Sequence, residues 1–353
     1  MPIDQKSKLI VFPKIGKFII IFFSVAFIVA GIRAYQLYQY VFRENVKTDY
    51  VLIIRENATY EQVTDSLVTH DVLLNIKAFR WVSKKKGYRN AVKPGRYHFK
   101  KGMNSNQIVN MLRSGLQEPV DVTFSNLRFK EDLAGKVSRY IEADSLSILN
   151  LFYDEKKIAD YGFTPETFRA MFIPNTYEFY WTTSAEAFAE RMKTEYDRFW
   201  TEERRKKAAE INLTPVEVIT LASIVQSETS KNEELQRVAG LYINRLKRGQ
   251  LLQADPTVKY AVGDFSLKRI LNSHLDIESP YNTYKYAGLP PGPILFPETA
   301  AIDAVLNYEQ HSYIYMCAKE DFSGYHNFAN TLEQHNRYAA LYRAALDKQK
   351  IWK

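Results

Sequence analysis

An apolar segment near the N-terminus constrains the fold of this chain more than any other feature. No charged residue interrupts FIIIFFSVAFIVAGI at 18–32, and Lys17 and Arg33 stand at its two borders. A bilayer core needs about 20 apolar residues. Border lysine and arginine side chains can reach the headgroups, and the aromatic residues that follow suit the interface. We therefore predict a single membrane-spanning helix over residues 17–42.

A cleaved signal peptide is the alternative interpretation of this segment, because its apolar region would have the same length. The residues after Ile32 are bulky and charged, and no small-x-small cleavage site stands out among them, which favours the anchor. Basic residues before the segment place residues 1–16 in the cytoplasm and the rest of the chain outside, by the positive-inside rule. These residues are Lys6, Lys8, Lys14 and Lys17.

The length and composition of the chain allow two folded domains besides the apolar segment. The sequence has 353 residues, of which 46% are hydrophobic, enough for a core in each domain. Lysine and arginine number 48 against 40 acidic residues, a net charge of +8. A basic exterior favours an anionic membrane or cell-wall polymer, and it is equally consistent with a solvated surface. The sequence has no arginine-rich run, RNP-like pattern or zinc-finger spacing, so we expect no nucleic acid partner.

The sequence indicates neither a disulfide nor a metal site. Cys317 is the only cysteine, so no intrachain disulfide and no cluster of thiolate ligands can form. His326 and His335 lack a spacing typical of zinc ligands. We therefore expect no metal and no cofactor.

The predicted fold class is α+β, with two domains after the apolar segment. The first, at residues 46–118, has a strand at 50–54, two helical stretches, a turn and strand at 93–99, and a final helix. This pattern fits a small α+β domain, and a simple spacer above the membrane explains it equally well. The polar, proline-containing stretch at 116–119 is typical of a boundary.

The second domain, at residues 119–353, is larger and also mixed. A strand is predicted at 119–124, a turn at 172–177, and a long helix from Ser184 toward Arg205. A pair of helices follows. The second helix of the pair is predicted to begin at a capping box formed by Ser230 and Glu233.

The first helix of this pair places a carboxylate beside apolar residues. Thr214 and Glu217 are spaced as a capping box, with Pro215 at the first helical position. Apolar residues then recur every three or four positions, and the same spacing brings Glu228 onto the inward face. These apolar residues are Val218, Leu221, Ala222 and Val225.

We predict that Glu228 holds a proton near neutral pH. Apolar surroundings and the negative end of the helix dipole both favour the neutral carboxyl. Such a carboxyl suits general acid catalysis. On the helix alone, a structural glutamate that caps or pairs at a helix junction is the more common case.

Several short motifs in a fixed order carry a family resemblance. They are KPGRY at 93–97, LRSG at 112–115, PNTY at 174–177, NRL at 244–246, LQADPTV at 252–258, SPYNTY at 279–284, GLPPGPI at 288–294, GYHNF at 324–328 and HN at 335–336. In these motifs the chain resembles the endolytic murein transglycosylases of the MltG/YceG type, membrane-anchored enzymes that cut the glycan strands of bacterial peptidoglycan. The resemblance covers nearly all of the chain after the apolar segment.

The chain departs from the family pattern at two positions. The family's helix motif usually has two glutamates spaced two apart, of which the second is catalytic. Glu228 stands at the second position, whereas Gln226 occupies the first. Asn175 stands where many relatives have an aspartate, so the resemblance does not define its role.

The resemblance implies a lytic reaction with Glu228 as the single catalytic residue. Glu228 would protonate the bond between N-acetylmuramic acid and N-acetylglucosamine, then take the proton of the muramic 6-hydroxyl as a 1,6-anhydro ring closes. No water is consumed. Polar residues must orient the sugar intermediate and balance its charge. The substrate-binding candidates are Gln253, Asp255, Thr257, Asn282, Tyr284, Tyr177 and His326.

The resemblance also implies a location and partners. It implies a LysM-like module at residues 46–118, a catalytic domain at 119–353, and a single-pass protein of the bacterial cytoplasmic (inner) membrane. The expected partners are peptidoglycan glycan strands, the membrane, and peptidoglycan synthases whose nascent strands the enzyme would terminate.

Two other functions remain open at this stage. One is a non-catalytic peptidoglycan-binding scaffold of the envelope, in which Glu228 is structural. The other is a water-using muramidase with Asp255 or Glu178 as a second carboxylate, because glycosidases generally need two carboxylates.

Overall fold

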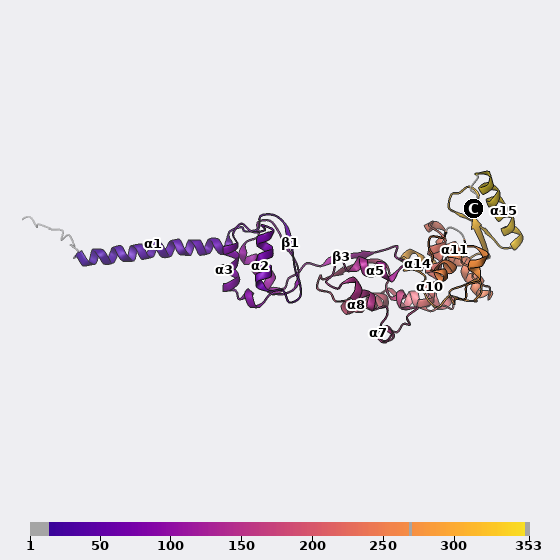
Figure 1. Ribbon diagram of the computed structural model, residues 1–353, viewed down its shortest axis with the longest axis horizontal. Coiled ribbons are helices and arrows are strands. Elements are labelled where there is room, and N and C mark those ends of the chain that lie inside the picture. Colours follow the sequence, from indigo (N-terminus) through magenta and orange to yellow (C-terminus); the bar gives the residue numbers. More distant parts are fainter. Residues whose placement is uncertain (1–13, 268–269, 350–353) are drawn as a thin grey trace, which may run out of the picture. The chain divides into compact units, whose positions relative to one another are not determined.

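The structure is a computed structural model that describes residues 14–267 and 270–349. The chain divides into two compact units, residues 1–119 and 120–353 (Figure 1). Each unit has its own cluster of buried hydrophobic side chains. Within the described ranges the fold combines helices with two-stranded antiparallel sheets. The mixed helix and strand content is the one that the sequence predicted.

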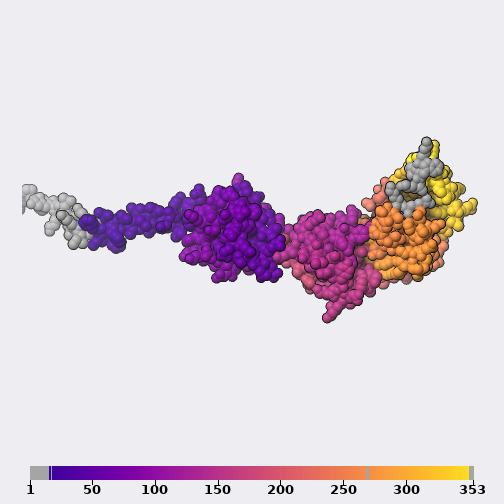
Figure 2. All heavy atoms as spheres, in the orientation of Figure 1, coloured from indigo at the N-terminus to yellow at the C-terminus, as the bar shows by residue number. Residues whose placement is uncertain are grey.

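The N-terminal helix α1 (Lys14–Phe42) is apolar and exposed. Residues 18–42 contain a window with a mean hydropathy of 2.2, and none of that window is buried. In the described part of the chain, α1 is the helix that is long and apolar enough to cross a membrane by itself. Figure 2 shows most of α1 free of contact with the globular part of its unit. The prediction for residues 1–13 lies outside the described residues.

Residues 44–118 form a small module of two strands and three helices. Strand β1 (Tyr50–Ile54) pairs antiparallel with β2 (Gly95–Phe99), with Tyr50 opposite Phe99. Both predicted strands are confirmed. The helical elements are α2 (Tyr60–Thr69), α3 (Ile76–Lys85), η1 (Tyr88–Asn90) and α4 (Ser105–Ser114). The core between them includes Phe79, Tyr88, Tyr97 and Phe99.

A buried asparagine fixes the end of α1 to this module. Asn45 is only 2% exposed. Its Oδ1 accepts from the backbone N–H of Asn75 at 2.6 Å, and its Nδ2 donates to the Asn75 carbonyl and to Oγ of Ser105. A fully bonded buried amide has one favourable geometry, because any shift leaves a buried polar atom unpaired. α1 therefore joins the module directly, and α3 and α4 both contact it.

The second unit begins with a two-stranded sheet. Strand β3 (Val120–Phe124) confirms the predicted strand and pairs antiparallel with β4 (Asn175–Phe179). The turn predicted at 172–177 is therefore wrong from Asn175 onward. The alternation of Tyr177 and Phe179 toward the core fits a strand that has a partner.

Six helical elements surround the space between and after these strands. The helix predicted from Ser184 is confirmed as far as Phe199, but its continuation toward Arg205 is wrong. The buried Trp200 leaves helical geometry, and Thr201 then caps a new helix through a bond from the Arg204 N–H. The elements are α5 (Lys130–Val137), α6 (Ser145–Asn150), α7 (Glu155–Asp160), η2 (Phe168–Met171), α8 (Ala185–Phe199) and α9 (Glu202–Glu210).

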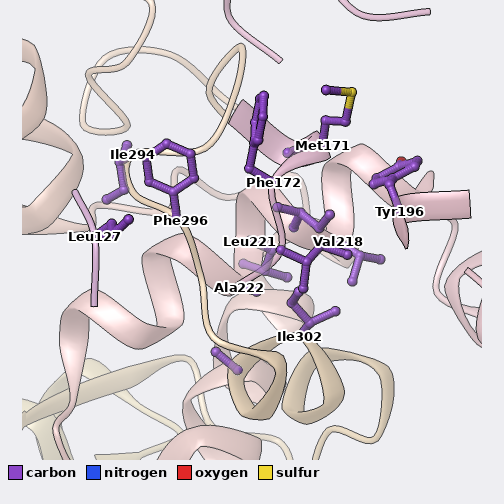
Figure 3. Close-up of a cluster of buried hydrophobic side chains, with 14 of the residues drawn as sticks. Leu127, Met171, Phe172, Tyr196, Val218, Leu221, Ala222, Ile294, Phe296 and Ile302 are labelled. Atoms are coloured by element: carbon purple, nitrogen blue, oxygen red, sulfur yellow. The ribbon is translucent and has the colours of Figure 1, made fainter. Parts of the chain in front are cut away.

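Helix α10 (Pro215–Glu228) is the central helix of the second unit. Its capping box of Thr214 and Glu217 is confirmed. Every residue from Val218 to Val225 is buried, so the single inward stripe that we predicted is too narrow. Figure 3 shows Val218 and Leu221 between Phe172 and Ile302. The helices packed on α10 are α9, α11 (Leu235–Lys247), α12 (Asp255–Val262) and α14 (Thr299–Leu306).

The predicted capping box at Ser230 and Glu233 does not form. The short element η3 (Asn232–Glu234) precedes α11 instead, and the Thr229 hydroxyl accepts from the Lys231 N–H. The remaining elements after α12 are α13 (Asn272–Leu275), the antiparallel strands β5 (Tyr315–Ala318) and β6 (His326–Ala329), and α15 (Leu332–Lys348). Helix α15 contacts both strands.

Candidate active site

A cavity of about 270 Å³ lies where the end of α10 meets α11 and β5. It brings together five of the residues singled out in the sequence. These are Glu228, Gln253, Asp255, Tyr284 and His326. A larger cavity of about 670 Å³ lies beside the first half of α10, but Glu228 does not line it. The groups suited to proton transfer therefore gather in the smaller cavity.

Glu228 is the last residue of α10, and its side chain is partly exposed in this cavity. The hydroxyl of Tyr242, on α11, donates a hydrogen bond of 2.7 Å to Oε1 of Glu228. Burial is the main reason that the pKa of Glu228 rises from 4.5 to about 7. The Tyr242 hydrogen bond opposes this rise, and the charge of Asp255 adds to it. Near neutral pH this carboxyl can therefore both give and take a proton.

Asp255 and Tyr284 form a second pair in the cavity. The Tyr284 hydroxyl donates to Oδ1 of Asp255 at 2.6 Å. Asp255 is the first residue of α12. Burial, with the negative charge of Asp255, raises the pKa of Tyr284, which therefore stays a donor. The cavity thus holds two carboxyl groups, Glu228 and Asp255, each of which accepts a hydrogen bond from a tyrosine.

Arg245 holds the walls of the cavity together. The side chain is buried, and its Nε donates to the Ile314 carbonyl at 2.6 Å. Its Nη1 donates to the carbonyls of Leu251 and Leu252 and to Oε1 of Gln253. The guanidinium therefore ties α11 to the loop before α12 and to the segment before β5. Arg245 belongs to the NRL motif at 244–246, but the sequence did not predict it as a site residue.

Gln253 sits in this loop with a strained backbone. Its φ of 51° lies in the left-handed region, which is uncommon for a residue other than glycine. Its N–H donates to the Thr283 carbonyl, and Nη1 of Arg245 donates to its side-chain Oε1. Such strain persists only where the surroundings enforce it, as they often do in functional sites.

Thr257 and Asn282 shape the loops and do not line the cavity. The Thr257 hydroxyl is within 2.8 Å of the Thr283 hydroxyl and donates to the Ala254 carbonyl. The buried Asn282 donates to the carbonyls of Leu275 and Ile277, and its Oδ1 accepts from the Tyr284 N–H. Both side chains are buried and bonded within the loops, at residues next to Asp255 and Tyr284, so neither is exposed to the cavity.

His326 lines the cavity and is held by a buried glutamate. Glu234 is 3% exposed, and its carboxylate accepts from the His326 backbone N–H and from Nδ1 of the ring, at 2.8 and 2.9 Å. The Thr229 hydroxyl also donates to Glu234. This network joins β6 to the residue that follows Glu228. The predictions missed Glu234, because nothing local marks it as the partner of a residue so far along the chain.

Tyr177 lies in the hydrophobic core and does not line the cavity. Its hydroxyl donates to the Ile173 carbonyl at 2.7 Å, and burial raises its pKa. The structure therefore does not bring Tyr177 to the other predicted site residues. Asn175 and Glu178 are exposed on β4, and Oδ1 of Asn175 accepts from the N–H of Thr176. Neither lines the cavity.

Gln226, at the first position of the helix motif, binds the backbone. Its Oε1 accepts from the Glu298 N–H at 2.6 Å, which fastens the start of α14 to α10. Gln226 does not line the cavity with Glu228. Among the residues that the structure describes, no group of three or more His, Cys, Asp or Glu side chains is arranged to hold a metal ion.

The site has the features of an acid–base centre for a polar substrate such as a sugar. A carboxyl with a raised pKa, a second carboxylate and two tyrosines share one small cavity. The chain belongs to the YceG-like family, whose model matches residues 52–340.

Similar proteins extend along most of the chain. The endolytic murein transglycosylase of Bacillus subtilis (strain 168) is 28% identical over 315 residues, which cover 84% of this chain and 85% of that protein. The protein of the same name from Streptococcus pneumoniae serotype 2 is 26% identical over 364 residues, which cover 92% of this chain but 65% of that protein. The crystal structure of a putative YceG-like protein from Listeria monocytogenes has a TM-score of 0.53 and 26% identity, and covers 82% of this chain and 99% of that one.

Proposed function

We propose that this chain is an endolytic murein transglycosylase. It cuts peptidoglycan glycan strands between N-acetylmuramic acid and N-acetylglucosamine and leaves 1,6-anhydro-N-acetylmuramic acid ends. The names of the Bacillus and Streptococcus relatives support this class of activity. The observation that carries the proposal is the carboxyl of Glu228, which has a pKa of about 7 and lines a cavity beside Tyr242.

Glu228 supplies both proton transfers of the lytic reaction. Its protonated carboxyl gives the proton to the glycosidic oxygen as the bond from C1 of the muramic residue to that oxygen breaks. The carboxylate then takes the proton of the 6-hydroxyl while O6 bonds to C1. Glu228 ends protonated, as it began. The balance needs no water and no second nucleophile.

The other residues of the cavity orient the substrate and balance charge. The negative charge of Asp255 favours the positive, oxocarbenium-like sugar that forms when the bond breaks. Tyr284 and Gln253, held by Asp255 and Arg245, offer polar atoms to the sugar hydroxyls. His326 offers Nε2, because its Nδ1 is used by Glu234. We propose that Thr257 and Asn282 act only through these residues.

A water-using muramidase is the second candidate function. Asp255 favours it, because this carboxylate shares the cavity with Glu228 and could activate a water. Glu178 offers no such support, since it is exposed on β4 and does not line the cavity.

Digestion of purified peptidoglycan in heavy-oxygen water separates the two functions. We expect internal cuts whose new muramic ends are 1,6-anhydro and carry no label, as measured by mass spectrometry. Reducing ends that carry the heavy oxygen would overturn the lytic mechanism in favour of hydrolysis. Release of terminal disaccharides alone would overturn the internal cutting. If Glu228→Gln cleaved peptidoglycan as fast as the original chain, Glu228 would be structural. The cleavage would then come from a contaminant, which would favour the non-catalytic scaffold.

We further propose that α1 is a single-pass anchor in the bacterial inner membrane, with the N-terminus inside and the second unit outside. The exposed apolar surface of α1 and the lysines that precede it in the sequence support this topology. In this position the enzyme would terminate nascent strands close to the synthases that extend them. A reporter that is active only outside the cytoplasm, fused after Lys353, should be active. A mature protein that starts after Arg33 would support the signal-peptide alternative.

We propose that residues 46–118 are a LysM-like module that helps to hold glycan. Support comes from the family resemblance and from the exposed basic residues Lys100 and Lys101 beside β2. Their replacement by glutamine should weaken sedimentation of the protein with purified peptidoglycan. Unchanged sedimentation would leave the module as a spacer.

A further inference from the structure

We propose that the exposed face of α3 is a membrane-docking surface. It binds the anionic phospholipid headgroups of the bilayer that α1 crosses. The docking face consists of Lys77, Arg80, Trp81 and Lys84. The inference rests on the proposed membrane anchor and is independent of the cleavage chemistry.

The sequence of α3 separates a basic face from an apolar one. Lys77, Arg80 and Lys84 are exposed, and Trp81 is partly exposed among them. The residues between them, including Phe79 and Val82, are buried in the module core. The helix contains no acidic residue. A helical face of basic residues around a tryptophan is typical of an interfacial helix, because the indole ring favours the headgroup layer and the cations attract anionic lipid.

The length of α1 sets the height of this face. A hydrocarbon core about 30 Å thick takes about 20 residues of helix. Counted from Phe18, the core ends near Leu37, so the last turn of α1 lies among the headgroups. Tyr38 and Phe42, whose ring centroids are 5.1 Å apart, are 59% and 53% exposed there. Exposed aromatic rings at this level suit the interface and do not suit water.

Contacts with α1 place α3 at the same level. The rings of Trp81 and Tyr40 are 6.4 Å apart. The bonds of Asn45 to Asn75 fix the start of α3 beside the end of α1. Figure 1 shows α3 on the side of the module where α1 leaves it. With α1 in a bilayer, Trp81 therefore lies within the headgroup layer.

A cavity between α1 and the start of α3 offers space for part of a lipid. Its volume is about 360 Å³, and its lining includes Tyr35, Gln39 and Leu74. The apolar side chain of Leu74 is 62% exposed, and contact with a lipid chain would be more favourable for it than contact with water. Arg43 and Glu44 also line the cavity and offset each other's charge. The net attraction for anionic headgroups therefore comes from α3.

The level of the docking face favours lipid over a glycan strand as its occupant. Glycan would have to enter the headgroup layer to reach Trp81, whereas lipid is already present there. Each basic residue near an anionic surface changes the ratio of docked to undocked module about fivefold, and salt weakens the effect.

The test uses the full chain in vesicles of phosphatidylcholine with and without phosphatidylglycerol. Some of the lipid is brominated near the headgroup, so that it quenches nearby tryptophans. Subtracting the signal of Trp81→Phe isolates Trp81 from the other tryptophans. We expect strong quenching of Trp81 that increases with phosphatidylglycerol and falls in high salt. Replacing Arg80 and Lys84 by glutamine should reduce the ratio of docked to undocked module on the order of 25-fold in anionic vesicles.

The matched control replaces Arg55 and Arg113 by glutamine. Both are exposed basic residues of the same module, at the ends of β1 and α4 remote from Asn45. This control should leave the quenching unchanged. An unquenched Trp81 in a chain that resists alkaline extraction would overturn the docking while leaving the anchor intact. Extraction of the chain from the vesicles would overturn the anchor itself. Docking to lipid would also be overturned if the two double variants reduced the quenching of Trp81 equally. The same conclusion would follow if the variant at Arg80 and Lys84 no longer sedimented with peptidoglycan while its Trp81 quenching stayed unchanged.

Discussion

The hydroxyl of Tyr242 donates to Oε1 of Glu228 at 2.7 Å, so the middle of α11 holds the last residue of α10. The two residues stand 14 positions apart, on helices that the junction at 229–234 folds against each other. The bond orients the carboxyl and favours its charged form, against the burial that raises its pKa. Four predictions concern this pair and the groups around it.

Glu228→Gln should fold and lose activity by a factor on the order of 10² to 10⁴, because the amide keeps the shape of the side chain and cannot exchange a proton. Release of 1,6-anhydro ends from purified peptidoglycan measures the loss. Gln226→Glu is the matched control two positions away. Its carboxylate can still accept from the Glu298 N–H, so the loss should be much smaller. Equal losses from the two substitutions would mean that Glu228 is not the acid.

The pH profile should report Glu228 directly. Its pKa of about 7 predicts that kcat/KM falls as the pH rises through about 7, because the acid form is lost. The Tyr242 hydrogen bond lowers this pKa, so Tyr242→Phe should move the descending limb to higher pH as well as reduce the maximal rate. Rates of anhydro-product formation between pH 5 and 9 would check this, and a limb that stays in place or moves down would contradict it.

Glu228→Gln should also stabilise the fold at alkaline pH. The pKa of Glu228 is about 7 in the folded chain and near 4.5 when unfolded, so the folded state binds the proton more tightly. Stability therefore falls as the pH rises from 4.5 to 7 and stays lower above it. Glutamine does not titrate, so at pH 8 the variant should be more stable than the original chain by about 3 kcal/mol, relative to their difference at pH 4. Melting curves should nearly coincide at pH 4, and a gap of equal size at both pH values would contradict this origin.

Asp255→Asn distinguishes a charge-balancing role from a direct one. The asparagine still accepts from Tyr284 but lacks the negative charge, so we expect a loss of about 10- to 100-fold with anhydro products unchanged. The pKa of Glu228 should fall at the same time, since the charge of Asp255 raises it. Glu178→Gln, on the exposed face of β4, should have no effect. A loss of the size seen for Glu228→Gln would make Asp255 a second catalytic carboxylate.

Local signals predicted the elements whose determinants lie within a few residues. Thr214, Pro215 and Glu217 define the start of α10, and the structure confirms that start. The second capping box, of Ser230 and Glu233, does not form because Thr229 takes over the junction: its hydroxyl accepts from the Lys231 N–H and donates to the carboxylate of Glu234, four residues after Ser230. Glu234 in turn depends on His326, which no local pattern brings near.

The parts of the site that the sequence did not predict depend on long-range contacts. The side chain of Arg245 holds the cavity together because it donates to the carbonyls of Ile314 and Leu251, which the fold brings to it. Tyr177 looked like a substrate contact in its motif, but antiparallel pairing of β4 with β3 turns it into the core. A motif marks residues that matter without saying which of them face a ligand and which support the loops.

The attachment of α1 to the module through Asn45 makes the orientation of the module depend on the bilayer that surrounds α1. A membrane helix whose apolar length exceeds the local thickness tilts to fit. Because α1 contacts α3 and α4 and the bonds of Asn45 fasten the chain just after its end, a tilt of the helix would tilt the module as well. With α1 in a membrane as proposed, the thickness of the surrounding lipid would therefore influence the tilt of the module at residues 44–118.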